Sequence, residues 1–97
     1  EKNYSSTIEV DLPHKPGVLG HITSLIGLNK GNIVNLEIIK RKKEHLTFSI
    51  DLQIKDLKNF TNLISQIKQK DYKFKIVRHK NKKNAFLQRI FKNFKRS

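Results

Sequence analysis

Residues 46–54 carry the pattern that most constrains the fold of this chain. Apolar side chains occupy every second position from Leu46 to Ile54, and Thr, Ser, Asp and Gln stand between them. A period of two is typical of a β-strand with one buried face and one open face. A sheet with one apolar face has to be covered by other elements, so the rest of the chain must supply them.

The other patterned segments supply that cover in a recognisable order. Residues 18–26 and 57–67 repeat apolar side chains at spacings of three and four, which indicates two amphipathic helices, and Asp56 is a good N-cap for the second. Strands are expected over 4–12, 32–42, 46–54 and 72–79. The order β-α-β-β-α-β with right-handed crossovers predicts an α+β, ferredoxin-like sandwich, in which both helices cover one face of a four-stranded antiparallel sheet.

In the second and fourth strands, the sequence pattern also predicts which side chains share a face. In 32–42 we expect Val34, Leu36 and Ile38 to share one face, although Ile33 and Ile39 interrupt the alternation. In the fourth strand, Tyr72, Phe74 and Ile76 are expected to face one way.

Prolines and glycines define the connection from the first strand to the first helix. Pro13 and Pro16 cannot lie inside a helix, and Gly17 can adopt backbone conformations closed to other residues. A glycine at a strand-to-helix turn leaves N–H groups free at the helix N-terminus, where a carboxylate or phosphate can bind; a simple tight turn is the alternative. Gly31, just beyond the helical pattern, is predicted at the C′ position.

The bulk composition limits the chain to one small domain with an unusual end. It has 97 residues, no Cys and a formal net charge of +13. Without Cys, stability must come from packing, and no apolar run is long enough to span a bilayer. The absence of Met at position 1 suggests a fragment of a longer protein.

Most of the positive charge lies at the C-terminal end. Residues 72–97 hold ten Lys and Arg and no acid. We expect residues 1–80 to form the domain and 81–97 to be an extension with a basic amphipathic helix from Ala85, whose apolar stripe is Phe86, Leu87, Ile90, Phe91 and Phe94. Candidate polyanion-binding residues are Lys82, Lys83, Arg89, Lys92, Lys95 and Arg96.

Several segments together resemble a known family. Residues 14–19, His-Lys-Pro-Gly-Val-Leu, resemble the loop of ACT domains, and 31–36, 50–57 and 67–78 resemble the C-terminal ACT domain of RelA/SpoT-type (p)ppGpp synthetase/hydrolases. The resemblance covers about residues 4–80. It departs at His14, where the family commonly has Asp, and in the extension, which lies beyond the usual end of the domain.

The resemblance implies a regulatory function. It implies a cytoplasmic module that binds a small ligand such as a branched-chain amino acid, associates with a second ACT domain, and modulates distant synthetase and hydrolase domains of a GTP pyrophosphokinase. The ligand-binding residues it implies are His14, Lys15, Pro16, Gly17, Val18, Leu19, Asn32 and Ile33. Two alternatives are a module that contacts ribosomal RNA or tRNA through its basic end, and an ACT domain of an amino-acid biosynthetic enzyme.

No enzymatic chemistry is predicted for the chain itself. The four histidines lie on different segments without metal-ligand spacing, and neither a phosphate-binding glycine loop nor a nucleophile motif is present. No cofactor or metal is therefore expected. The open face of the central strands lacks the aromatic side chains on which RNA-recognition domains stack bases, so RNA binding through the sheet is not expected. Because a four-stranded sheet leaves two edges, with residues 32–42 at one of them, a dimer is expected.

Overall fold

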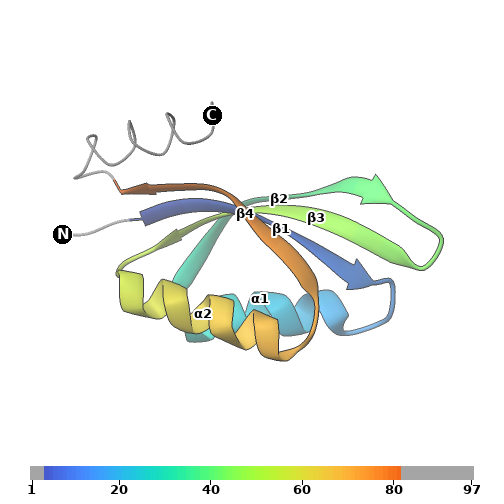
Figure 1. Cartoon of the computed structure of the whole chain (residues 1–97), viewed down its shortest axis with the longest axis horizontal. Coiled ribbons are helices and arrows are strands. Elements are labelled where there is room, and N and C mark those ends of the chain that lie inside the picture. The colour runs from blue at the N-terminus through green and yellow to red at the C-terminus, as the bar shows by residue number, and fades with distance from the viewer. Residues whose placement is uncertain (1–3, 82–97) are drawn as a thin grey trace.

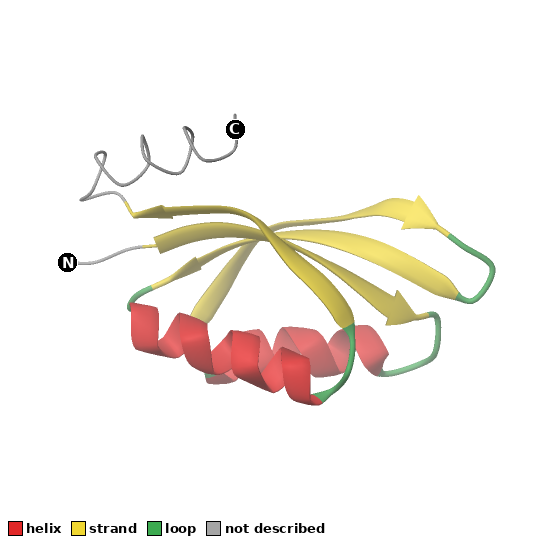
Figure 2. Cartoon of the chain, in the orientation of Figure 1, coloured by secondary structure: helices red, strands yellow, loops and turns green. Residues whose placement is uncertain are grey.

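The computed structural model describes residues 4–81 and has the predicted element order. The elements are β1 (Tyr4–Pro13), α1 (Val18–Leu28), β2 (Gly31–Arg41), β3 (His45–Ile54), α2 (Leu57–Gln69) and β4 (Lys73–Asn81). The strands form one antiparallel sheet in the order β2-β3-β1-β4, and both helices lie on the same face of it (Figure 1). Figure 2 shows the resulting two layers. The ferredoxin-like prediction is confirmed, whereas the extension beyond Asn81 lies outside the described residues.

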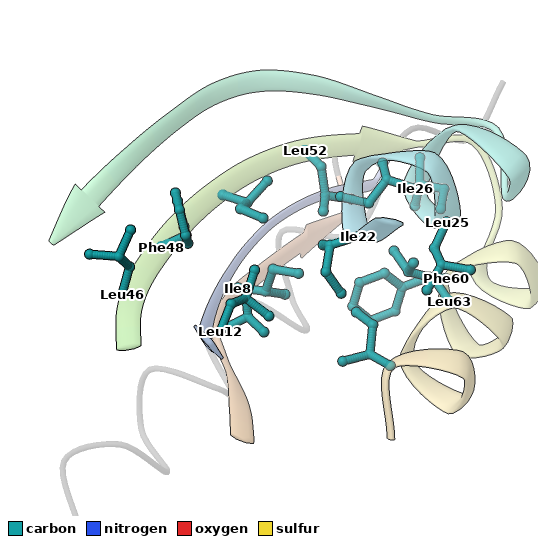
Figure 3. Packing of buried hydrophobic residues seen from close by; sticks show 14 residues of the cluster. Ile8, Leu12, Ile22, Leu25, Ile26, Leu46, Phe48, Leu52, Phe60 and Leu63 are labelled. Carbon is teal, nitrogen blue, oxygen red and sulfur yellow. The ribbon is translucent and has the colours of Figure 1, made fainter. Parts of the chain in front are cut away.

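The core fills the space between the sheet and the helices (Figure 3). All five apolar positions of β3 are buried, as the alternation predicts. Each such side chain contributes about 1.5–3 kcal/mol on burial, so packing alone can hold a domain without disulfides. The other members of the core come from β1, α1 and α2: Ile8, Val10, Leu12, Ile22, Leu25, Ile26, Phe60, Leu63 and Ile67.

The two helices end in ways that their sequences explain. At the start of α2, the Asp56 carboxylate accepts a hydrogen bond from the backbone N–H of Asn59 at 2.8 Å, which confirms the predicted N-cap. At the end of α1, the buried Asn29 side chain donates to the carbonyl of Leu25 at 2.9 Å and to the side chain of Gln66 at 2.7 Å. Asn29 therefore closes α1 and ties it to α2.

The predicted position of Gly31 at C′ is wrong by one residue. Lys30 occupies that position, with a left-handed φ of 63°, and Gly31 is the first residue of β2. The glycine is needed for another reason: a Cβ there would lie 2.8 Å from Cγ2 of Ile26 and 3.1 Å from its carbonyl oxygen. Close packing of the strand on the helix, rather than backbone conformation, selects glycine at this position.

Two β-bulges interrupt β2, at Val34 and Ile39. They explain the irregular apolar pattern. Paired residues of antiparallel strands point to the same face, so Ile33, Leu36 and Ile38, opposite inward-facing residues of β3, face the helices. The prediction that Val34 shares the face of Leu36 and Ile38 is therefore wrong, because the extra residue of the bulge shifts the alternation.

Strand β4 also contains a register shift, opposite Thr7 and Ile8. Phe74 and Ile76 pair with buried positions of β1 and face the helices, as predicted. Tyr72 lies just before the strand and packs against the core. Within residues 4–81, neither helix has the length and apolarity needed to cross a membrane.

Candidate functional site

The connection between β1 and α1 is a short, anchored loop over residues 14–17. The backbone N–H of His14 donates to the carbonyl of Glu44 at 2.9 Å, which ties the loop to the β2–β3 hairpin. Within the loop, the N–H of Lys15 donates to the carbonyl of Pro13 at 2.9 Å. The loop is exposed to solvent yet held at both ends.

Gly17 shapes the entry into α1. Its φ of 87° lies in the left-handed region, which glycine adopts without steric cost. As the N-cap it offers no side chain to accept the first N–H groups of the helix, and α1 has no acidic residue in its first turn. The N-terminus of α1 therefore opens into the loop with its partial positive charge unneutralised by a side chain, and this environment favours an anionic group.

The charged side chains around the loop also favour an anionic group. Lys15 is exposed in the loop itself, and the neighbouring hairpin carries four basic residues at 40–43 against one acid, Glu44. Val18 and Leu19, the first residues of α1, are partly buried against the core. Positive charge thus lies around the loop, and two partly buried apolar residues follow it directly in the chain.

The remaining predicted ligand residues lie elsewhere in the chain. Asn32 and Ile33 begin β2, at the opposite end of α1 from the loop (Figure 1). With 11 residues, α1 spans about 16 Å. Asn32 pairs with Gln53 on the open face, whereas Ile33 pairs with Leu52 on the helix side. The structure therefore brings residues 14–19 together and does not bring Asn32 and Ile33 to them within one chain.

Strand β2 forms one edge of the sheet, as predicted. Between its two bulges, residues 35–38 keep regular pairing with β3. Leu36 and Ile38 face the helices but are each 39% exposed, and the bulge residues Val34 and Ile39 are 60% and 45% exposed. The edge therefore combines unpaired backbone groups with an unusual amount of exposed apolar side chain.

A second feature was not predicted from the sequence: a hollow of about 290 Å³ on the open face of the sheet. Thr7 is central to it, donating to the carboxylate of Asp51 at 2.7 Å and accepting from Arg78 at 3.3 Å. The lining residues are Ser5, Ser6, Thr7, Val34, Asp51, Leu52, Gln53 and Arg78. The alternation of residues 46–54 predicts Asp51 on this face, but only the bulges bring Val34 and Arg78 beside it.

In residues 4–81, no three His, Asp or Glu side chains lie close enough together to hold a metal ion. His21 lies in α1 with its Nε2 atom buried and without a hydrogen-bond partner. The candidate polyanion-binding residues, Lys82 to Arg96, lie outside the described part of the chain.

Comparisons with known proteins agree with this architecture. Residues 1–78 match the family model of the ACT domain. GTP pyrophosphokinase rsh of Brucella ovis and that of Brucella melitensis are each 29% identical over 68 residues, which is 70% of this chain and 9% of the relative. The chain thus spans less than a tenth of the curated relatives it matches.

Solved structures show the same fold. The ACT domain of a GTP pyrophosphokinase from Chlorobium tepidum superposes with a TM-score of 0.57 at 16% identity, covering 81% of this chain and 97% of that one. Prephenate dehydratase from Staphylococcus aureus gives a TM-score of 0.61 at 17% identity, covering 75% of this chain and 28% of that one. With the family match, the strand order and the loop in place, the chain belongs to the ACT domain family and is related in sequence to the GTP pyrophosphokinases.

Proposed function

We propose that this ACT domain senses a small ligand such as an amino acid and regulates distant catalytic domains of a parent protein of the GTP pyrophosphokinase type. The observation that carries the proposal is the loop at residues 14–17, which opens the uncapped N-terminus of α1 to solvent. The relationship to GTP pyrophosphokinases supports the choice of parent.

The loop offers partners for the carboxylate and the aliphatic side chain of a free amino acid. The ligand's carboxylate would lie at the N-terminus of α1, near Lys15, where the helix dipole favours negative charge. An aliphatic side chain would pack on Val18 and Leu19, which favours valine, leucine or isoleucine over polar amino acids. Gly17 is needed because its left-handed backbone leaves the first turn of the helix accessible.

A second copy of the chain would complete the site. Pairing of two β2 edges about a two-fold axis runs the strands antiparallel, so the start of one β2 meets the end of the other. Asn32 and Ile33 would then lie near the partner's hairpin, to which the partner's own 14–17 loop is anchored through the Glu44 carbonyl. The two groups of predicted ligand residues, separated in one chain, would meet across this interface.

Regulation follows if the ligand favours one arrangement of the dimer. A ligand bound between two copies stabilises that arrangement by its differential affinity, and the shift is transmitted to whatever the domain contacts in the parent. The proposal therefore requires ligand binding and self-association to be linked.

Titration of the full chain with leucine, valine or isoleucine tests the proposal. Amide resonances of residues 17–19 and of Asn32 should shift first in NMR spectra, and the fraction of dimer should rise. Gly17→Ala should abolish these shifts, because alanine strains the left-handed position, whereas Gly20→Ala, which meets no atom within 4 Å, should retain them. Unchanged spectra at millimolar ligand would contradict the ligand-sensing function.

A second candidate is an ACT domain of an amino-acid biosynthetic enzyme. The fold match to prephenate dehydratase favours it, but that likeness at 17% identity concerns the fold alone. The sequence that precedes Glu1 in the parent distinguishes the two candidates: hydrolase and nucleotidyl-synthetase domains fit the first, and an amino-acid biosynthetic enzyme fits the second. Contact with ribosomal RNA or tRNA stays a prediction attached to residues 82–96.

A further inference from the structure

The open face of the sheet has a hollow at the corner where the described chain ends. Strand β4 pairs its last residue, Asn81, with Tyr4, and Lys80 with Ser5, which lines the hollow. Sixteen residues follow Asn81, and they carry the apolar stripe Phe86, Leu87, Ile90, Phe91 and Phe94. The extension therefore starts beside a concave surface of its own domain.

From these observations we propose that residues 82–97 dock across the open face of the sheet, with their apolar stripe on Val34 and the hollow. The helix side of the sheet is already covered by α1 and α2. From β4 to β2 the open face is three strand spacings wide, about 14 Å. A helix over residues 85–97 has 13 residues and would be about 20 Å long, so the extension can reach Val34 at the far rim.

Val34 is the apolar contact that distinguishes this face. As the extra residue of a bulge it lies on the rim of the hollow, and 60% of it is exposed. Its neighbours Thr7 and Asp51 are joined by a 2.7 Å hydrogen bond. An apolar side chain placed beside them would leave this bond intact, provided that the other oxygen of the Asp51 carboxylate keeps its contact with water.

Charge on the open face is balanced. The central strands present Glu9, Asp11 and Asp51, but Lys75 and Lys73 of β4 pair with the first two on the same face. Glu9 and Lys75 form an ion pair at 3.7 Å, and Arg78 lies beside Thr7 in the hollow. The six Lys and Arg of residues 82–97 therefore gain no net attraction from this face, and the docking depends on the apolar stripe.

A spin label tests the docking in the full chain. The protein has no Cys, so Gln88→Cys provides a single attachment site that lies off the apolar stripe and changes no charge. The label should broaden the amide resonances of Thr7, Val34, Asp51 and Gln53 more than those of α1 and α2. Added Val34→Asp should remove this broadening. Ile39→Asp, at the other bulge of the same strand and outside the hollow, should preserve it.

Three results would overturn the proposal. Broadening centred on the helices or on residues 35–38 would place the extension elsewhere. No selective broadening would show that the extension does not dock on its domain. In a mixture of isotope-labelled protein without the spin label and unlabelled protein with it, broadening of the open face would show that the extension binds another copy.

Discussion

Strands β2 and β3 are neighbours of similar length, yet they differ in apolar pattern, in burial and in the regularity of their pairing. In β3 every second residue is apolar, all five of these are buried, and its pairing with β1 is regular. In β2 the apolar residues are interrupted, two bulges break the pairing, and four large apolar side chains remain exposed. The difference reflects position, because β3 lies inside the sheet and β2 at its edge.

An interior strand has both neighbours to fix its register, and a slip by one residue would move its entire apolar set to the open face. An edge strand has one neighbour and can accept extra residues. In β2 the bulges divide the pairing with β3 into regular stretches at 31–33, 35–38 and 40–41, and each bulge restricts where a further strand could add. We infer that β3 holds the fold and that β2 serves recognition.

The largest expected effect on stability comes from comparing two residues that pair with each other. Ile50 of β3 is fully buried, whereas its partner Leu36 of β2 is 39% exposed. Ile50→Ala should lower the free energy of unfolding by about 2–5 kcal/mol, because it removes buried apolar area and leaves a closed cavity. Leu36→Ala should lower it by less than about 1.5 kcal/mol, because less buried area is removed and no closed cavity forms. Urea unfolding at a protein concentration where the chain is monomeric measures both. Equal losses would contradict the separation of roles.

The next test concerns the junction where β2 meets α1. Gly31→Ala should lower the free energy of unfolding by about 1–3 kcal/mol, because its Cβ would lie 2.8 Å from the Ile26 side chain. Gly27→Ala in α1 is the matched control. No atom lies within 4 Å of the added carbon there, and alanine in a helix should raise the stability by about 0.5–1 kcal/mol. In thermal unfolding, the melting temperature should fall for Gly31→Ala and rise for Gly27→Ala.

These residues also show how far sequence reasoning reaches. The alternation from Leu46 to Ile54 and the Asp56 cap are local signals, and both predict the structure correctly. Register shifts are not local: whether β2 bulges at Val34 depends on its pairing with β3 and on packing against α1, which no period in a single segment encodes. The hollow was missed for that reason, since Val34 and Arg78 reach it only through register shifts in two strands.

The candidate ligand site was only partly predictable for a related reason. Residues 14–19 are contiguous, so a Pro-Gly signal can place them together. Asn32 belongs to the other end of α1, and bringing it to the loop needs a second chain. Similarly, the sequence pattern predicts Gly31 at the C′ position of α1, whereas in the structure it is the first residue of β2. Glycine is needed there because a Cβ would collide with Ile26, and this crowding is not visible in the sequence.

A smaller effect is expected one residue earlier. Lys30 holds a left-handed φ of 63° between α1 and β2, a conformation that glycine adopts at lower cost. Lys30→Gly should therefore raise the free energy of unfolding by up to about 1 kcal/mol, offset in part by the greater freedom of glycine in the unfolded chain. Urea unfolding measures this change. A loss of more than about 1 kcal/mol would show that the lysine side chain stabilises the junction.

The central claim is that β2, rather than β4, is the edge through which the domain recognises a second copy. Ile38 and Ile76 lie on these two edges, both on the helix side of the sheet, and are 39% and 45% exposed. Sedimentation velocity of the full chain with Ile38→Lys or Ile76→Lys compares the edges directly. Our account predicts a dimer for the parent sequence and for Ile76→Lys, and a monomer for Ile38→Lys. A parent chain that stays monomeric at high concentration, or a dimer lost only with Ile76→Lys, would contradict it.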